Sequence, residues 1–325
     1  MSDRIARPAP ATPAMAFADP TAEGYRCYLC GGQTFTRLHA WPVGDRWNPA
    51  RISIAVWQCG CGIVFLYPVP GPEQLPDCGD WWSKRRKRPR RNLTYKRIRA
   101  AVSHALVGSP RYRFVKYTRK AIASGKLLDV GCGDGRLLQV AGPHYDCVGL
   151  EPSPIAAEQA RRKGFPVLQT AFETARLRSR SFDVVTLDSV IEHVRNPLHV
   201  LRKANRILKP GCVIALKTNK FNGPAYRMHG RGWYGFRHGY HTFLFTGKTL
   251  SRTLEAAGFE VLKRPKRDRL LDDILILWGR KVREVEPASA AADPSCSASG
   301  ESSPSGLPKP CGRDLCRSPA DGRLP

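Results

Sequence analysis

The chain has 325 residues and a formal net charge of +26, which is room for one large domain and a smaller module. No apolar run approaches the roughly 18 residues of a membrane-spanning helix, and the first residues lack the apolar core of a secretory signal. Eleven scattered cysteines do not form the pattern of a small disulfide scaffold. We therefore exclude membrane-spanning and disulfide-stapled classes and expect a cytoplasmic protein.

Composition divides the chain into five expected parts. A leader rich in Ala and Pro and a tail rich in Ser and Pro offer little to bury, so both are predicted to be disordered. Between them lie a cysteine-bearing module, a basic stretch, and a long segment of alternating apolar and amphipathic runs that is typical of βαβ units. The expected boundaries are 1–24 for the leader, 25–80 for a zinc-ribbon-like module, 81–124 for a basic, partly helical connector, 125–283 for the α/β domain and 284–325 for the tail.

The module contains four cysteines in two closely spaced pairs, Cys27 with Cys30 and Cys59 with Cys61. The first pair has the two-residue separation typical of half of a tetrahedral zinc site. The second pair is one residue closer together than that pattern. We expect the four thiolates to hold one structural Zn²⁺. Two alternatives stay open: His39 or Cys78 replaces a ligand, or the module is degenerate and its reduced cysteines only pack.

A strongly basic run follows the module. Sixteen Lys and Arg and no Asp or Glu lie between Trp81 and Leu128, beginning with KRRKRPRR at 84–91. Mutual repulsion keeps such a segment solvated. Residues 84–99 are therefore either a plain linker or a contact for an anionic partner such as RNA or an acidic substrate. Apolar spacing predicts a helix at 95–106.

The run LLDVGCGDG at 127–135 is the most informative stretch. An apolar strand leads into three glycines at alternate positions, and glycine lets a ligand lie against bare backbone. The next apolar run ends in Glu151, and an acid at a strand tip accepts hydrogen bonds from a ribose. This pattern predicts a nucleoside-cofactor site at the carboxyl edge of a parallel sheet. The alternative is a glycine turn in some other doubly wound protein.

Strands and helices are expected to alternate from here on, giving a doubly wound, mostly parallel, seven-stranded α/β sheet. The expected strands lie near 126–130, 146–150, 167–170, 182–187, 212–217, 259–263 and 273–278. The expected helices lie at 155–163, 198–208 and 248–257. Pro197 suits the first turn of the second helix, and the Pro-Gly pair at 210–211 is expected to end it.

Several motifs in order resemble the class I S-adenosylmethionine-dependent methyltransferases. The glycine spacing is G-x-G-x-G, whereas the dinucleotide-binding pattern would need glycine in place of Arg136. Residues 182–185 (FDVV) and 191–194 (IEHV) look like the fourth-strand motif of that family, and 207–211 (ILKPG) looks like the entry to its fifth strand. Later motifs resemble one branch, whose members often carry an N-terminal cysteine module and modify sugars or other small metabolites. They are Gly232-Trp233, His241, Phe245-Thr246, Leu250 and 257–261.

The resemblance implies a site for S-adenosylmethionine. By position, the glycines approach the methionine moiety, Asp129 supports the loop and the cofactor's amino group, and Glu151 takes the ribose hydroxyls. Phe172 is a candidate for the adenine edge, and Asp188 lies where the donor methyl would point. The implied cofactor residues are Asp129, Gly131, Gly133, Gly135, Glu151, Phe172 and Asp188.

Methyl transfer is an in-line displacement at a sulfonium carbon, so the protein mainly positions the reactants. A hydroxyl, amine or acidic carbon acceptor must also lose a proton to a base. His193 follows the fourth strand and His241 lies in the insert expected to cover the acceptor, and both titrate near neutrality. The alternatives are that His193 caps a loop or pairs with Glu192, and that His241 packs against Trp233 and Tyr240.

The sequence thus predicts an S-adenosylmethionine-dependent methyltransferase acting on a small molecule, with a sugar or sugar-like metabolite as the leading acceptor. A second hypothesis is RNA methylation, which the basic connector and the cysteine module favour, although no motif that reads bases is evident. A third is a cofactor-binding protein without transfer activity.

Overall fold

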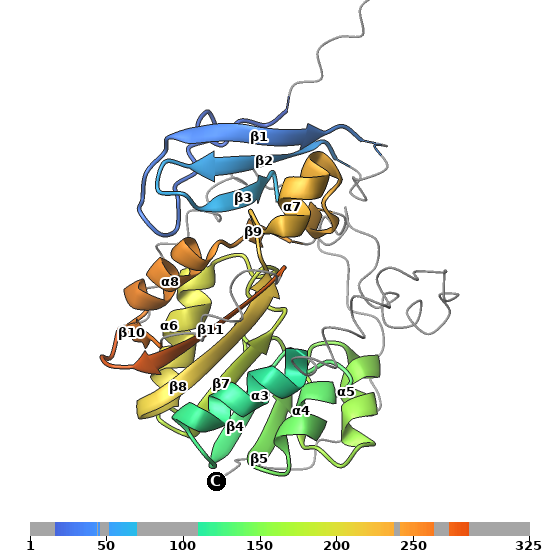
Figure 1. Ribbon diagram of the computed structural model, residues 1–325, viewed down its shortest axis with the longest axis vertical. Helices are drawn as coiled ribbons and strands as arrows, with labels where there is room; N and C mark the ends of the chain where they lie inside the picture. Colours follow the sequence, from blue (N-terminus) through green and yellow to red (C-terminus); the bar gives the residue numbers. More distant parts are fainter. Residues whose placement is uncertain are drawn as a thin grey trace, which may run out of the picture. The chain divides into compact units, whose positions relative to one another are not determined.

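The structure, a computed structural model, describes residues 17–43, 45, 52–69, 110–236, 241–262 and 273–285. Its strands form a four-stranded sheet and a seven-stranded sheet (Figure 1). The basic run at 84–99, the helix expected at 95–106 and Cys78 lie outside the described residues. Among those described, no helix combines the length and the apolar character needed to cross a membrane.

The large sheet confirms the predicted fold class. Its strands run in the order β10-β11-β8-β7-β4-β5-β6, and neighbouring pairs from β8 to β6 are parallel. Only β11 and β10 are antiparallel to their neighbours within this sheet. The strands are β4 (Lys126–Val130), β5 (Asp146–Leu150), β6 (Val167–Leu168), β7 (Phe182–Asp188), β8 (Leu208–Asn219), β10 (Phe259–Val261) and β11 (Ile274–Lys281).

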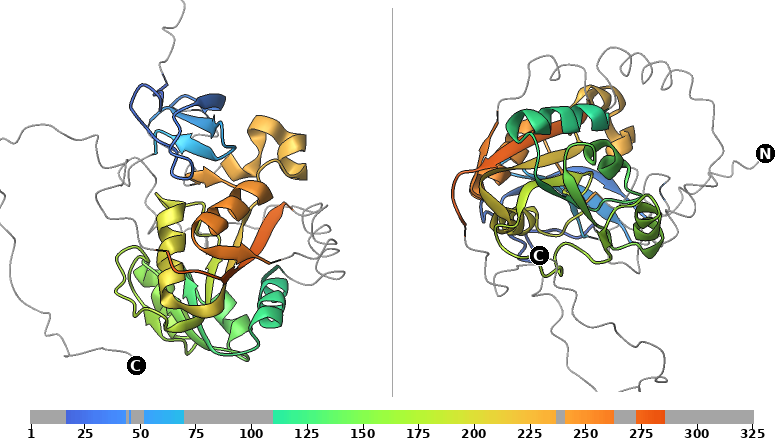
Figure 2. Two further views of the ribbon diagram at one scale, coloured as in Figure 1. Left: turned by 90° about the vertical axis from the view of Figure 1, so that its left-hand side faces the viewer. Right: turned by 90° about the horizontal axis from the view of Figure 1, so that it is seen from below.

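Helices cover both faces of this sheet (Figure 2). Successive residues of a strand point to opposite faces, so Leu128 and Val130 join one buried cluster while Leu127 joins the other. Helices α6 and α8 pack over the first cluster, and α3, α4 and α5 pack over the second. The helices are α3 (Pro110–Ala121), α4 (Arg136–Ala141), α5 (Pro154–Arg161), α6 (Pro197–Ile207), α7 (Pro224–His229) and α8 (Gly247–Ala256).

Side-chain caps set the start of two helices. Asn196 precedes α6 and accepts a 3.0 Å hydrogen bond from the backbone amide of His199, with Pro197 in the first turn as predicted. Thr246 and Thr249 form a reciprocal capping box at the start of α8. Both helices therefore begin within a residue of the sequence-based expectation.

Helix α3 was not predicted, and it lies in the range assigned to the basic connector. Its buried face carries Phe114, which packs in the second cluster with Trp278 of β11. The indole Nε1 of Trp278 donates a 2.9 Å hydrogen bond to Oγ1 of Thr118 on the same helix. The other face carries exposed Lys and Arg, so the apolar positions of this helix are not evident in the basic sequence around them. The five-part division of the chain stays a prediction.

The small sheet has the order β1-β2-β3-β9, with antiparallel neighbours. Strand β9 comes from the insert that follows β8, far along the chain from the other three strands. Buried residues of the small sheet, including Trp57 and Phe65, share one cluster with Leu128 and Leu187 of the large sheet. The strands are β1 (Phe35–Trp41), β2 (Ile54–Cys59), β3 (Val64–Tyr67) and β9 (Phe243–Leu244).

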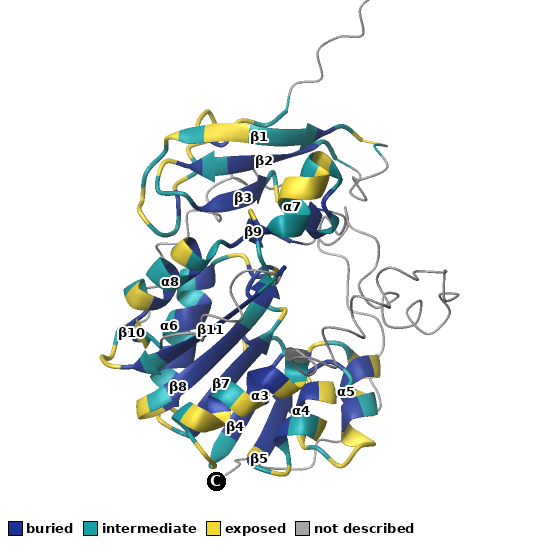
Figure 3. Ribbon diagram, in the orientation of Figure 1, coloured by how far each residue is buried: buried dark blue, intermediate teal, exposed yellow. Residues whose placement is uncertain are grey.

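Burial follows this arrangement (Figure 3). The central strands of the large sheet are buried along most of their length, since helices cover both faces. Strand β8 is longer than predicted and begins at Leu208, because its first residues pair with Phe182 at the start of β7. The carboxyl ends of the parallel strands meet at one edge, where the candidate site lies.

Candidate active site and cysteine centre

The glycine loop between β4 and α4 is held in a conformation that favours glycine. Gly131, Gly133 and Gly135 all have positive φ, at 65°, 55° and 77°. A Cβ added at Gly131 would lie 2.7 Å from Cγ2 of Val190, so the loop also packs too closely for a side chain there. The loop is tied to the next strand by hydrogen bonds from the amides of Gly131 and Cys132 to the Leu150 carbonyl.

Glu151 directly follows β5, and its side chain reaches back to this loop. Its Oε2 accepts a 2.9 Å hydrogen bond from the amide of Gly133, and its Oε1 accepts one of 2.9 Å from the amide of Ser153. The side chain is only 7% exposed, and this burial raises its pKa against the opposing effect of the two amides. Each carboxylate oxygen has a further lone pair for a hydroxyl donor. The structure thus brings together the glycines and the acid that the sequence singled out.

Asp129 lies beneath the loop at 1% exposure. The hydroxyl Oγ1 of Thr186, on neighbouring β7, donates a 2.7 Å hydrogen bond to its Oδ1. Burial raises the pKa of Asp129 to about 8, and the nearby Asp188 carboxylate acts in the same direction. The surroundings of Asp129 therefore favour its protonated form.

Asp188 stands at the carboxyl end of β7, between two cations. It forms an ion pair with Lys217, its register partner on β8, and another with Arg111 of α3, whose Nε lies 3.3 Å from Oδ2. Neither cation was predicted as a site residue. Lys217 could have been found, because it ends the strand predicted beside β7. Arg111 is one of many basic residues in its stretch, and nothing in the sequence distinguishes it.

Phe172 follows β6 and is packed in the core at 4% exposure. The ammonium of Lys203 lies 5.2 Å from the centre of its ring. Its contact with adenine stays a prediction, as do the roles of the other cofactor residues.

Two histidines meet beyond the end of β7. The ring centroids of His193 and His241 are 4.8 Å apart, and the rings are inclined at 58°. His193 is exposed in the turn after β7, whereas His241 is buried just before β9, with Nδ1 2.7 Å from the carbonyl oxygen of Gly235. Because a carbonyl oxygen only accepts, Nδ1 carries the hydrogen and donates a hydrogen bond to the Gly235 carbonyl.

Glu192 lies beside these rings and was not predicted as a site residue. Its side chain is 2% exposed, and burial raises its pKa to about 7. Ligand atoms of Glu192, His193 and His241 all lie within 4.8 Å of one another. The cluster joins the loop after β7 to the insert before β9, so sequence spacing alone could not reveal it.

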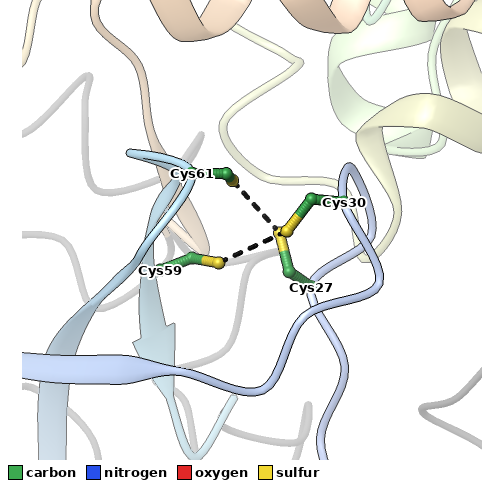
Figure 4. A group of neighbouring side chains, drawn as sticks. All are labelled: Cys27, Cys30, Cys59 and Cys61. Carbon is green, nitrogen blue, oxygen red and sulfur yellow. Dashed lines mark hydrogen bonds between the residues drawn. The ribbon is translucent and has the colours of Figure 1, made fainter.

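The four cysteines of the module converge on one point (Figure 4). The Sγ atoms of Cys27 and Cys61 are 3.7 Å apart, and those of Cys30 and Cys59 are 3.6 Å apart. These separations are too long for disulfides, and all four cysteines are free. They match the edge of about 3.8 Å that a tetrahedron with Zn–S bonds of about 2.3 Å would have. The donor set and its spacing therefore fit zinc.

Tight turns explain how the short second pair reaches this point. Cys59 ends β2, its amide donates to Ile63, and its carbonyl accepts from the amide of Gly62, which closes the turn around Cys61. The alternative ligand His39 lies elsewhere, with Nε2 3.1 Å from the hydroxyl of Tyr226. The short spacing is thus compatible with four cysteine ligands.

Comparisons with known proteins agree with this architecture. The family model for a methyltransferase domain matches residues 99–264. The ubiquinone biosynthesis O-methyltransferase of Haemophilus ducreyi is 33% identical over 125 residues, which are 35% of this chain and 53% of that protein. The enzyme of the same name from Photobacterium profundum is 36% identical over 109 residues, which are 31% of this chain and 46% of that protein. The chain thus spans about half the length of the curated relatives it matches.

Among solved structures, a SAM-dependent methyltransferase of Thermotoga maritima, described as a possible histamine N-methyltransferase, has a TM-score of 0.43 and 23% identity. It covers 58% of this chain and 96% of its own. The family match extends over more than half of the chain and includes the glycine loop, Glu151 and both histidines. The chain belongs to the methyltransferase domain family, with the class I fold of the S-adenosylmethionine-dependent enzymes.

Proposed function

We propose that the protein transfers a methyl group from S-adenosylmethionine to a hydroxyl oxygen of a small molecule. The observation that carries the proposal is the hydrogen bond from the Gly133 amide to Glu151, which combines a bare backbone loop with a carboxylate at the adjoining strand end. Oxygen as the accepting atom is supported by the names of the curated relatives. A sugar or sugar-like metabolite is our proposed acceptor class.

The residues at the sheet edge suit this cofactor. S-adenosylmethionine supplies a methyl group activated by a positively charged sulfur. Glu151 has the lone pairs to accept the ribose hydroxyls, and the glycine loop leaves room for close approach to the methionine part. Asp188 offers negative charge toward the sulfonium, and Arg111 offers positive charge toward a carboxylate.

The acceptor hydroxyl must lose its proton as the new bond forms. In the neutral form of His241, Nδ1 donates to Gly235, so Nε2 is the basic nitrogen. His193 lies beside it at the exposed end of the pair and provides a route for the proton to solvent. The two histidines are therefore our proposed catalytic residues.

We further propose that Cys27, Cys30, Cys59 and Cys61 hold one structural Zn²⁺. The nearly tetrahedral sulfur separations support four-thiolate coordination, with no ligand position left for a substrate. The free thiols of Cys132, Cys147 and Cys212 fit a reducing, cytoplasmic location.

Two measurements on the full chain test the proposed function. Calorimetry with S-adenosylmethionine should give saturable binding near one site per chain. Methyl-labelled cofactor incubated with cell extract should label the small-molecule fraction and leave the RNA fraction unlabelled. A chain lacking residues 84–91 should behave the same in both assays. Labelled RNA, lost with that deletion, would overturn the small-molecule assignment, and absent cofactor binding would overturn the proposal itself.

A further inference from the structure

A buried carboxylate and two imidazoles meet at the open edge of the large sheet. Ligand atoms of Glu192, His193 and His241 are all within 4.8 Å of one another, and they come from two chain segments that pack together. The backbone also joins these segments, because the amide of Phe243 in β9 donates a 3.1 Å hydrogen bond to the Glu192 carbonyl. The turn after β7 and the segment before β9 thus hold the cluster together.

The Glu192 carboxylate is incompletely satisfied. Its Oε2 is buried and makes no hydrogen bond of good geometry within the described residues, although the Thr218 hydroxyl approaches the carboxylate and opposes the rise of its pKa. Lys217, a cation near enough to influence it, is already ion-paired with Asp188. A buried charge without a partner is costly, so such an oxygen is normally matched by a hydrogen-bond donor or a cation.

His241 is oriented in the way that metal-binding histidines usually are. Its Nδ1–H donates to the Gly235 carbonyl at 2.7 Å, which fixes the ring and directs Nε2 as the ligand nitrogen. His193 is exposed, while Glu192 and His241 are buried. The cluster therefore combines two buried donors with one exposed donor.

We propose that Glu192, His193 and His241 bind one divalent transition-metal ion. Two imidazole nitrogens and one carboxylate oxygen suit Zn²⁺, Mn²⁺, Fe²⁺ or Co²⁺, whereas Mg²⁺ and Ca²⁺ prefer oxygen donors. Bonds of about 2.1 Å place donor atoms about 3 to 3.4 Å apart, and the three ligand atoms already lie within 4.8 Å of one another. Three protein ligands leave coordination positions open for a small molecule.

The use of this ion in catalysis rests on the proposed function, although its binding does not. An acceptor hydroxyl bound to the ion loses its proton to solvent more readily, because the cation lowers the hydroxyl pKa. The resulting oxyanion forms the new O–CH₃ bond as the S–CH₃ bond breaks, and the sulfur keeps the bonding electrons. With the ion bound, both histidines act as ligands, and this route takes the place of the direct proton uptake by His241 that we propose above for the metal-free site.

The two metal centres differ in chemistry, and the test uses this difference. Untagged full chain is treated with a mild chelator, its residual metal is counted by mass spectrometry, and Co²⁺ is titrated by calorimetry and absorbance. We expect zinc to stay at the four-thiolate centre and one added Co²⁺ to bind without a sulfur-to-metal charge-transfer band. Co²⁺ that binds only with that band, or does not bind, would overturn the proposal.

Variants assign the site. Glu192→Gln keeps the side-chain shape and removes the charge, so it should weaken Co²⁺ binding at least tenfold, and His241→Ala should do the same. His229→Ala removes an exposed histidine of α7 and should leave the affinity unchanged. Cys30→Ser should reduce the residual zinc, which assigns the zinc that survives chelation to the four-thiolate centre. Unchanged Co²⁺ affinity in folded Glu192→Gln would rule the site out.

Binding of S-adenosylmethionine, measured in the same preparations, separates this proposal from the proposed function. If chelated protein without added Co²⁺ binds the cofactor and transfers methyl groups, the catalytic role of the ion is contradicted and the proposed function is not. If Glu192→Gln loses Co²⁺ binding and no form of the protein binds the cofactor, the metal site is supported and the proposed function is contradicted.

Discussion

The backbone amide of Gly133 donates a 2.9 Å hydrogen bond to Oε2 of Glu151. This bond joins the loop after β4 to the end of the neighbouring strand β5. The carboxylate is therefore already oriented at the loop and need not be ordered by a ligand, which lowers the entropic cost of binding. We therefore expect changes at Glu151 to affect cofactor binding more than changes at other side chains.

Changing Glu151 should weaken cofactor binding selectively. Glu151→Ala removes a carboxylate acceptor, and hydrogen bonds to carboxylates contribute about 1.5–3 kcal/mol, so we expect the S-adenosylmethionine dissociation constant to rise about 10- to 100-fold. Calorimetry measures this directly. Glu158→Ala, an exposed acid on α5, is the matched control and should bind normally. Equal affinity in the two variants would contradict the ribose assignment.

Replacing Gly131 should weaken cofactor binding. Gly131→Ala combines a left-handed backbone, which costs about 1–2 kcal/mol for other residues, with a Cβ 2.7 Å from Cγ2 of Val190. Gly164→Ala has a similar backbone, with φ of 87°, and no atom within 4 Å of the added Cβ. We expect both variants to lose similar backbone stability in urea unfolding, whereas only Gly131→Ala loses cofactor binding. Adding Val190→Ala should recover part of that loss.

Much of the large sheet could be predicted because its strands are buried on both faces and are therefore continuously apolar. The bounds of β4 and β5 agree with the expected strands 126–130 and 146–150. Helix α3 was missed because only its inner face is apolar and the outer face merges with the basic run. Strand β9, the two residues Phe243–Leu244, exists through pairing with β3, which no local pattern reveals.

The candidate site divides in the same way. The glycine loop and Glu151 were foreseeable, since consecutive strands bring them to one sheet edge. The contact between His193 and His241, and the burial of Glu192 beside them, depend on how the insert folds back over the loop after β7. Local sequence carries no information on that distance.

The buried Asp129 should make stability depend on pH. Its pKa is raised from 3.8 to about 8, so the unfolded chain releases this proton at much lower pH than the folded protein does. The resulting stabilisation is complete below about pH 4 and is lost as the pH rises to about 8. Asp129→Asn keeps the acceptor for Thr186 but does not titrate. Between pH 5 and 8, the unmodified protein should therefore lose a few kcal/mol more free energy of unfolding than the variant.

Urea unfolding at several pH values checks this difference. Other buried acids, including Glu192, titrate in both proteins, so the comparison isolates Asp129. If the free energies of unfolding of the two proteins differ by the same amount at every pH, the pKa of Asp129 is not raised in the folded protein, and the prediction is contradicted.

Loss of metal from the cysteine centre should also affect the segment that carries His241. The Cys61 carbonyl accepts a 2.7 Å hydrogen bond from Arg252 of α8, and the hydroxyl of Tyr28 lies 3.1 Å from that of Thr253. Through β3, the same module pairs with β9, two residues after His241. Releasing the metal would therefore loosen the segment that carries this histidine.

Cys30→Ser should lower bound zinc from near one per chain to near zero and reduce the free energy of unfolding by a few kcal/mol, since metal binding energy is also folding energy. Cys212→Ser, at a cysteine outside the cluster, is the matched control and should keep both. Hydrogen exchange should then rise in residues 241–246 of Cys30→Ser while β4 and β5 stay protected. If hydrogen exchange rises only around the four cysteines, the centre stabilises its own turns and does not stabilise residues 241–246.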